Sequence, residues 1–439
     1  YRRPSLEVSP AFSGADAVST AAAPEGSPSL AQWWTVFQDP ILDDLVARAL
    51  AANLDLRVAE ARVREVRAET RSVRSRLLPG VGASGGFSRN RLSGNGVLGE
   101  AVEAIGQDLT QSSSVAGLDL NWELDVFGGR RRALEAARAD LGMIEAAEQA
   151  IRISIVAEVG RNYLEVRGRQ KQLGVARANL KSQESTLALT VDRRRAGLSS
   201  DLDVVRAEAQ TAETRSQIPL MEESLQRAIH RLGVLMGQPP TVLAGLLGEV
   251  RPLPVVSPGI PVGLPSDLLR RRPDVLMAER ELAAATARIG VATAELFPKF
   301  YLTGAAGLQS IDASDFFTGG SRFWALGPSF QWPVFSAGRI RGQIQAQNAR
   351  QEQAALRYEQ VVLTSLEEVE NVLVGYGQEL RRLEALAAAE ASSRRAVSLA
   401  QERYRGGLVD FLNVLETERA LYRLQEQQVA SELQLQQHL

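Results

Sequence analysis

The sequence contains a long internal duplication. Short segments of its first half return in its second half, in the same order and at similar separations. Three matched pairs indicate a duplicated unit of roughly 200 residues, far longer than the units of solenoid repeats. The fold must therefore accommodate two copies of one structural module. The matched pairs are segments 77–79 and 296–298, 126–130 and 334–339, and 195–205 and 405–415.

The composition argues against several functional classes. The 439 residues include no cysteine and only two histidines, His230 and His438. Disulfides, thiolate zinc sites and cysteine nucleophiles are therefore excluded, and little remains for acid–base catalysis. A net charge of −2 gives no basic field that would attract nucleic acid. We expect a protein that is not an enzyme, with no catalytic, cofactor-binding or metal-binding residues.

Two very long helices are predicted, one in each copy. Segments 129–196 and 339–405 contain no proline, and their apolar residues recur mostly at spacings of three, four and seven. About 65 residues in one helix extend for roughly 100 Å, which is more than a globular domain needs. A shorter helix comes before each hairpin, and a return helix follows each long one. Stacked end to end, the two shorter helices match the long helix in length.

One β-hairpin precedes each long helix, at about 81–126 and about 300–334. The clearest strand, 118–126, alternates apolar with acidic or polar residues, so one face of the hairpin is apolar. This pattern is typical of a membrane β-barrel, with lipid outside and water inside, although a half-buried soluble sheet is an alternative. Four strands cannot close a barrel, because membrane barrels start at about eight strands and lipid does not tolerate open edges. An oligomer is therefore expected, either a dimer or a trimer.

The chain is predicted to have four parts. The linker between the copies contains seven prolines and five glycines, so a helix cannot persist there. Ser266 or Asp267 is expected to cap a short helix that ends in a solvated arginine run, 270–272. The four parts are an extended N-terminal arm and equatorial anchor (1–40), a first repeat (41–236), a linker in the equatorial region (237–265) and a second repeat (266–439).

Several motifs resemble those of the TolC-like outer-membrane efflux proteins. The resemblance covers nearly the whole chain and is strongest to the lipoprotein branch that serves tripartite resistance-nodulation-division (RND) pumps. It implies an α+β membrane protein, a homotrimer with a twelve-stranded outer-membrane β-barrel, a periplasmic α-helical tunnel and a mixed equatorial region. The matching motifs are Trp33-Trp34-x-x-Phe37-x-Asp39-Pro40, segment 52–63, segment 264–275, Glu295-Leu296-Phe297-Pro298 and Tyr404-Arg405-Gly406-Gly407.

The resemblance also implies the function and the partners. It predicts a duct in the outer membrane of a Gram-negative bacterium, with a long periplasmic extension, that passively conducts drugs or other small toxic compounds to the exterior. The implied partners are a periplasmic adaptor (membrane fusion) protein, an inner-membrane RND transporter and outer-membrane lipid. An N-terminal lipid is implied on a cysteine that would precede Tyr1. A type I protein-secretion duct and a periplasmic coiled-coil scaffold without a barrel remain alternatives.

The turns that follow the long helices supply the candidate gate residues. In the resembled family these turns surround the periplasmic aperture, and a trimer repeats each side chain three times around one axis. Asp201 and Asp410 have a second interpretation as helix N-caps, since aspartate is a preferred cap. Leu408 is a candidate steric plug, with ordinary packing as the alternative. The gate candidates are Asp410, Asp203, Asp201, Leu408, Arg405, Gly197 and Gly407.

Three tryptophans on the predicted strands are candidates for a membrane-interface girdle. Tryptophan is enriched where a membrane protein passes from lipid to water, because its ring is apolar and its N–H is polar. Ordinary strand packing is the alternative interpretation. The three residues are Trp122, Trp324 and Trp332.

Overall fold

The computed structural model describes residue 12, residues 30–254 and residues 271–438. Most of the predicted arm, part of the predicted linker and the expected cap at Ser266 or Asp267 lie outside the described residues. The described chain divides into two compact units, each of which contains segments of both repeats. The first unit comprises Arg62–Ala146 and Leu276–Gln360, and the second comprises the described residues of Leu6–Ala61, Ala147–Val275 and Val361–Leu439.

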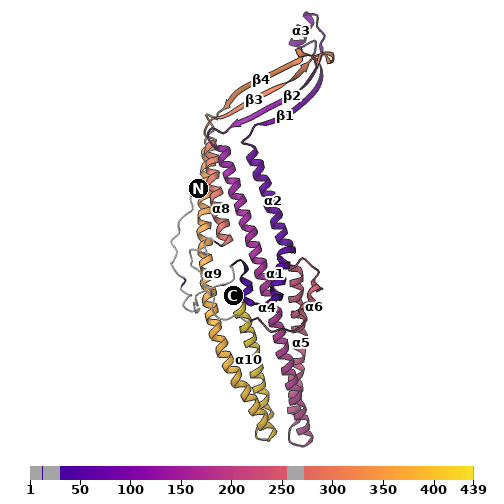
Figure 1. Ribbon diagram of the computed structural model, residues 1–439, viewed down its shortest axis with the longest axis vertical. Coiled ribbons are helices and arrows are strands. Elements are labelled where there is room, and N and C mark those ends of the chain that lie inside the picture. The colour runs from indigo at the N-terminus through magenta and orange to yellow at the C-terminus, as the bar shows by residue number, and fades with distance from the viewer. Residues whose placement is uncertain (1–11, 13–29, 255–270, 439) are drawn as a thin grey trace. The chain divides into compact units, whose positions relative to one another are not determined.

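The first unit contains an antiparallel sheet of four strands in the order β1-β2-β3-β4 (Figure 1). Leu120 of β2 is paired with Val81 of β1 and Gly304 of β3, and Gly304 is paired with Leu326 of β4. Pairing of β2 with β3 joins the two hairpins and leaves β1 and β4 at the edges. The strands are β1 (Gly80–Arg91), β2 (Thr110–Leu124), β3 (Lys299–Ser310) and β4 (Arg322–Gln331).

The connection between β1 and β2 contains a helix that the sequence analysis missed. Segment 93–112 has the glycine-rich composition of a loop, but α3 (Val97–Ala104) forms within it. Gly99 is buried there, and a Cβ at this position would lie 1.9 Å from the Ser93 carbonyl oxygen. Only glycine permits this close approach, so Gly99 allows the segment to fold into a compact turn. The connection between β3 and β4 instead holds two short 3-10 turns, η4 (Ala313–Asp315) and η5 (Gly319–Ser321).

Helices α4 and α8 pack closely within the first unit because small residues lie between them. Ala139 of α4 clusters with Ala283 and Ala284 of α8. A Cβ on Gly290 would lie 2.9 Å from Cγ of Arg132, so the glycine allows the Arg132 side chain of α4 to pack directly against α8. Among the described residues, no helix is long and apolar enough to cross a membrane. The helices that contribute to this unit are α2 (Leu54–Ser75), α4 (Gly129–Arg195), α8 (Pro273–Ala294) and α9 (Arg339–Arg405).

The second unit has a large apolar core around α4. Leu42, Val159 and Ile229 are fully buried in it, and Trp33 and Trp34 pack against its side. Phe12 packs separately, against Leu373, Tyr376 and Leu435. The other elements of this unit are η2 (Leu30–Phe37), α1 (Pro40–Ala52), α5 (Asp201–Leu235), η3 (Pro240–Leu243), α6 (Ala244–Leu247) and α10 (Phe411–Gln437).

The expectation of a solvated arginine run at 270–272 is wrong for Arg272. Its guanidinium donates to the Asp274 carboxylate at 2.7 Å and to the Glu368 carboxylate at 2.6 Å. The two acceptors hold Arg272 between the start of α8 and the side of α9. Arg271 is exposed, and Arg270 lies outside the described residues.

Candidate functional site

The first candidate site is the turn that follows α4. The Leu198 amide donates to the Arg193 carbonyl at 2.8 Å, and the Gly197 amide donates to the Arg194 carbonyl at 2.9 Å. These two bonds define a Schellman turn, whose central residue must adopt a left-handed backbone. Gly197 has φ +73°, which glycine adopts without steric strain.

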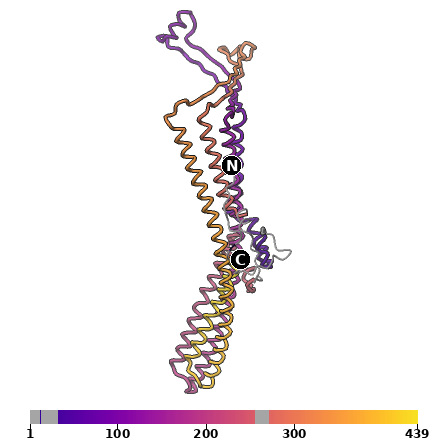
Figure 2. The backbone as a smooth tube through the Cα atoms, turned by 90° about the vertical axis from the view of Figure 1, so that its left-hand side faces the viewer, coloured from indigo at the N-terminus to yellow at the C-terminus, as the bar shows by residue number. Residues whose placement is uncertain are grey.

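The turn that follows α9 repeats this geometry. The Leu408 amide donates to the Arg403 carbonyl at 2.9 Å, and the Gly407 amide donates to the Tyr404 carbonyl at 3.0 Å. Gly407 has φ +72°. Figure 2 shows both turns at the same end of the second unit, where α4, α5, α9 and α10 run alongside one another. The duplication therefore produces two equivalent helix tips.

The return helices begin differently at the two tips. Ser200 is the N-cap of α5, and it forms a capping box with Asp203: the Asp203 amide donates to Ser200 Oγ at 3.2 Å, and the Ser200 amide donates to Asp203 Oδ2 at 3.1 Å. Asp201 is therefore not the cap, and it pairs instead with Arg194. Asp410 occupies the N-cap position of α10, but its side chain makes no cap hydrogen bond.

The half-buried Asp203 carboxylate is held in its ionised form. Partial burial alone raises its pKa, but the amide and hydroxyl of Ser200 and the hydroxyl of Ser199 donate hydrogen bonds to it. These bonds lower the pKa of Asp203 below its usual value. The negative charge also suits the N-terminus of α5, where the helix dipole is positive.

Arg193 joins the two tips. Its Nη1 donates to the Arg405 carbonyl at 2.9 Å, and its guanidinium lies over the Tyr404 ring, 4.8 Å from the centroid. The Tyr404 hydroxyl lies 3.3 Å from Ser199 Oγ. Beneath these contacts, the buried Phe411 belongs to an apolar cluster that also contains Tyr404. The two tips of one chain are thus packed together and cross-linked by polar contacts.

A buried carboxylate lies deeper in the same four-helix region. Glu418 of α10 accepts hydrogen bonds from Thr186 Oγ1 of α4 and from Gln401 Nε2 of α9, both at 2.9 Å. No cation pairs with it among the described residues. Burial raises the pKa of Glu418, and the two hydrogen bonds only partly oppose this effect.

The second candidate site is the sheet of the first unit, whose two faces differ sharply. The strand register places Leu118, Leu120 and Trp122 on the same face as Trp324 and Leu326. Much of this face is open, because Trp324 is 81% exposed and Leu326 is 64% exposed. The opposite face carries mainly glycine, alanine, serine, threonine, asparagine and glutamine, together with Asp119, Glu123 and Lys299.

Comparison with known proteins covers almost the whole chain. Residues 45–238 and 264–439 match the family model described as outer membrane efflux protein. The chain belongs to this family. It is 34% identical over 396 residues to the pyoverdine export outer membrane protein OpmQ of Pseudomonas aeruginosa. This match covers 90% of this chain and 82% of OpmQ. It is 32% identical over 439 residues to the toluene efflux pump outer membrane protein TtgF of Pseudomonas putida. This match covers 99% of this chain and 89% of TtgF.

A solved structure extends the similarity to the fold. The outer-membrane channel OprN superimposes with a TM-score of 0.92 at 36% identity, and the match covers 100% of this chain and 96% of the OprN chain. The family, the channel fold and the outer-membrane location predicted from the resemblance are confirmed. This outer membrane efflux protein is an exit duct for efflux across the outer membrane.

The efflux protein places its predicted gate residues in distinct environments. Gly197 and Gly407 occupy the left-handed positions of the turns, and Arg405 is the last residue of α9. Leu408 is 76% exposed, so it is not packed within its own chain. The Asp410 carboxylate is exposed and forms no ion pair within the described part of the chain. The structure thus brings Arg405 and Gly407 together with Arg193, whereas Asp203 is occupied by its capping box.

The three predicted interface tryptophans of the efflux protein lie at two levels of the sheet. The indole N–H of Trp122 donates to the Leu77 carbonyl at 3.1 Å, and that of Trp332 donates to the Leu296 carbonyl at 3.0 Å. Both therefore lie where a helix of the first unit ends, and their acceptors, Leu77 and Leu296, are equivalent residues of the two repeats. Trp324 lies near the opposite end of β4 and is largely exposed.

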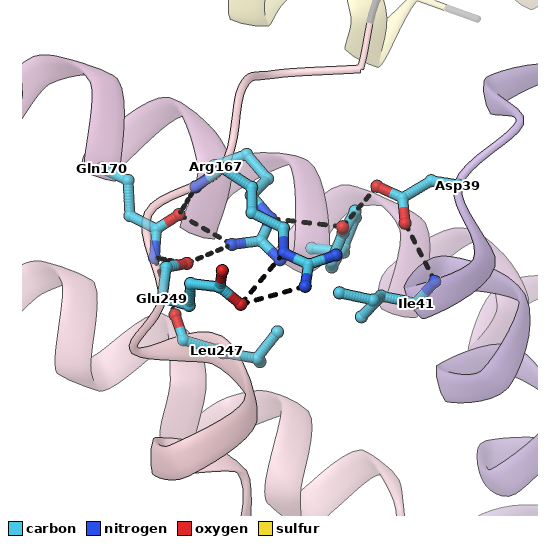
Figure 3. Close-up of polar contacts among 8 residues, drawn as sticks. Asp39, Ile41, Arg167, Gln170, Leu247 and Glu249 are labelled. Carbon is cyan, nitrogen blue, oxygen red and sulfur yellow. Dashed lines mark hydrogen bonds and ion pairs between the residues drawn. The ribbon is translucent and has the colours of Figure 1, made fainter.

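A buried arginine in the efflux protein was missed by the sequence analysis (Figure 3). Arg167 is fully buried. Its Nη1 donates to Gln170 Oε1 at 2.8 Å and to the Glu249 carbonyl at 2.9 Å, and its Nε donates to the Tyr163 hydroxyl at 3.2 Å. The Tyr163 hydroxyl in turn donates to Asp39, which caps α1. Burial and this bond to Asp39 raise the pKa of Tyr163 to about 12.

The Arg167 network joins three segments of the second unit. It ties α4 to the start of α1 and to the segment that follows α6. Nothing local in the sequence marks Arg167, because it is one of many arginines at polar-looking helical positions. Arg193 and Tyr404 were similarly overlooked, although Tyr404 belongs to the Tyr404-Arg405-Gly406-Gly407 motif. Among the described residues, no three His, Asp or Glu side chains are grouped so as to hold a metal ion.

Proposed function

We propose that three copies of this efflux protein form the exit duct of a tripartite system. The duct receives drugs or other small toxic compounds from a periplasmic adaptor and an inner-membrane RND transporter, and conducts them passively to the exterior. Energy comes from the partner pump, and no residue of this chain has a catalytic role. The proposal includes a lipid on a cysteine that precedes Tyr1, which mass measurement of the protein isolated from membranes tests.

The two-faced sheet is the observation that carries the proposal. Its apolar, exposed face suits lipid, and its face of small and polar residues suits a water-filled lumen. The sheet ends at β1 and β4, whose outer backbone groups require partners in lipid. Edges of neighbouring copies satisfy one another when β4 of one copy pairs with β1 of the next. Three copies supply twelve strands, and two copies would supply eight.

Residues 1–439 contain no cysteine, and the thiol of the proposed lipidated cysteine is blocked by its lipid, so introduced cysteines test this closure directly. Pairs of single cysteines are introduced, one within 81–89 of β1 and one within 324–330 of β4, and the purified oligomer is oxidised. Pairs that meet across the edge should give covalent species that end at the trimer on a non-reducing gel. A series that ends at the dimer would replace the twelve-stranded barrel with an eight-stranded one. Polymers without an end would overturn closure altogether.

The helix tips are the proposed gate. Contacts between them hold the aperture closed, and engagement of the adaptor and the pump loosens them. Asp410 is exposed at the tip of each copy, so three copies place a ring of acidic groups there that favours cations. The double variant Asp203→Ala, Asp410→Ala should change single-channel conductance or cation preference. Unchanged conductance and selectivity would show that the two aspartates have no role in the gate.

A small-molecule substrate is favoured over a secreted polypeptide. OpmQ is named for pyoverdine export and TtgF for toluene efflux, and both match most of this chain. Deletion of the gene should raise cellular accumulation of a dye exported by RND pumps, and the wild-type gene should restore export. A deletion strain that exports dyes normally but fails to secrete a polypeptide would favour the type I secretion duct. Extraction from membranes by salt alone would favour the scaffold.

A further inference from the structure

The lipid-facing side of the sheet carries three charged residues, and all of them are arginines. The register places Arg89 opposite Ser112, Arg91 opposite Thr110 and Arg322 opposite Leu308, on the face shared by Leu120 and Leu326. All three arginines are exposed. The alternate residues of β1 to β4 on this face include no aspartate or glutamate.

The three arginines lie toward one end of the face, near the β1–β2 and β3–β4 connections. Each edge strand repeats one local pattern there. Phe87 precedes Arg89 by two residues on β1, and Arg322 precedes Trp324 by two residues on β4, so an exposed aromatic lies on the apolar side of each arginine. Aromatic side chains mark the border between lipid and water in membrane barrels. The arginines therefore lie at the headgroup level.

No protein carboxylate neutralises these guanidinium groups within the described residues. Arg91 Nη1 makes a long contact of 3.5 Å with Thr110 Oγ1. Two of the acids in the two connections are bound to backbone amides: Asp108 accepts from the Thr110 amide at 2.8 Å, and Asp312 accepts from the Ser314 amide at 3.0 Å. A neighbouring copy cannot supply a counter-ion from its strands either, because its lipid-facing side has the same composition.

We propose that Arg89, Arg91 and Arg322 bind the phosphate groups of lipid headgroups in the leaflet on the loop side. The inference depends on the proposed function, because it requires this face to lie against lipid. Arginine offers a planar fork of donors that matches phosphate geometry. Closure of the barrel would bring Arg322 of one copy to the same seam as Arg89 and Arg91 of the next, since β1 and β4 are the two outer strands of the sheet (Figure 1).

The test compares two lipids and two variants of the purified full chain in neutral detergent. The probes are bisphosphorylated lipid A and its dephosphorylated form, and native mass spectrometry measures bound lipid. The strand variant carries three substitutions together, Arg89→Gln, Arg91→Gln and Arg322→Gln. The matched control is Arg62→Gln, Arg227→Gln, Arg394→Gln, which removes the same charge from exposed helical ion pairs.

The wild type and the control should bind the phosphorylated lipid more tightly than the dephosphorylated one. Each arginine at a membrane surface contributes about five-fold in affinity, so the strand variant should lose about a hundred-fold for the phosphorylated lipid alone. Equal binding of both lipids by the wild type, or full retention of binding by the strand variant, would overturn the proposal. Conductance of the same samples distinguishes failure of this inference from failure of the proposed function. Channels with normal conductance but no preference for the phosphorylated lipid would reject only this inference. Absence of channels would reject the proposed function.

Discussion

The guanidinium of Arg193 lies over the aromatic ring of Tyr404, 4.8 Å from its centroid, and so links two helix tips that are far apart in the sequence. The same guanidinium donates to the Arg405 carbonyl. Each tip is closed by its own Schellman turn, so local hydrogen bonds hold each turn in shape. The Arg193–Tyr404 contact is different, because it holds one tip against the other. Separation of the tips in the proposed gate would break this contact, together with the hydrogen bond from Arg193 to the Arg405 carbonyl and the contact between the Tyr404 hydroxyl and Ser199 Oγ.

Replacing Arg193 should loosen the tips. Arg193→Gln removes a cation–π contact that is worth about 0.5–1 kcal/mol at an exposed site. We expect a higher open probability in single-channel recordings and greater uptake of large hydrophilic antibiotics. Arg195→Gln is the control, because Arg195 is exposed and, within the described part of the chain, its ion pair is with Asp192 on its own helix. Identical behaviour of the two variants would show that the Arg193–Tyr404 contact has no role in closure.

The capping box should make the first turn of α5 sensitive to Asp203 and to acid. Loss of an N-cap bond costs about 1 kcal/mol, so Ser200→Ala and Asp203→Asn should both speed amide hydrogen exchange at the start of α5. The pKa of Asp203 is lowered on folding, so its stabilising effect is present above the ordinary value of 3.8 and is lost as pH falls through the lowered pKa.

Asp410→Asn provides the comparison for the capping box. Asp410 makes no cap hydrogen bond, so exchange at the start of α10 should not change. Equal acceleration at both helix starts would contradict the asymmetry between the two tips.

Glu418 should make α10 less stable as pH rises. Burial raises the pKa of this carboxyl above its ordinary value of 4.5, so the folded state favours the neutral form. The stability from the neutral form is fully present below pH 4.5 and is lost as pH rises through the raised pKa. Glu418→Gln should therefore give α10 higher hydrogen-exchange protection than the wild type at pH 8, and a flatter dependence on pH.

Glu208→Gln is the matched control for Glu418→Gln. Glu208 is the equivalent residue of the first repeat, and it is exposed. This variant should leave the pH dependence of α10 unchanged. A wild-type α10 whose protection does not vary with pH would show that burial has little effect on Glu418.

Arg167 should be required for assembly of the segment that follows α6. Its removal leaves the Tyr163 hydroxyl without the Arg167 donor and leaves Gln170 Oε1 with only the long 3.5 Å contact from the Arg251 amide. A buried acceptor that loses its donor costs about 1–3 kcal/mol. Arg167→Lys should not restore stability, because one ammonium cannot reproduce the fork of donors. Limited proteolysis at 240–254 and thermal unfolding measure the effect. Arg177→Lys, in an exposed pair with Glu222, should behave as the wild type.

Several elements follow from local sequence alone. The absence of proline from 339–405 predicted a continuous helix, and α9 spans Arg339–Arg405. The glycine after α4 predicted the end of that helix, because few other residues adopt the left-handed backbone of Gly197. Alternation over 118–126 predicted a strand with one apolar face. Each of these signals depends on residues that are close together along the sequence, and their separation in sequence does not depend on the tertiary structure.

Other features were missed because their local signal is weak or ambiguous. α3 lies in a glycine-rich segment, and the eight residues of this helix are too few for a clear periodicity. Ser200, Asp201 and Asp203 are all compatible with an N-cap, and the choice of Ser200 depends on the backbone conformation of the turn. Asp410 shows the converse case, since it has a favoured cap residue type and position but no cap hydrogen bond.

The sequence by itself determined the repeated module, the lengths of its helices and the two faces of its strands, because periodicity and backbone preference are local properties. Only the tertiary structure decided that β2 pairs with β3, that Arg193 reaches Tyr404 and that Arg167 is buried. These contacts join residues that are distant along the chain, so they depend on how helices and strands pack. The duplication predicted two equivalent tips, and packing joined them within one chain through Arg193.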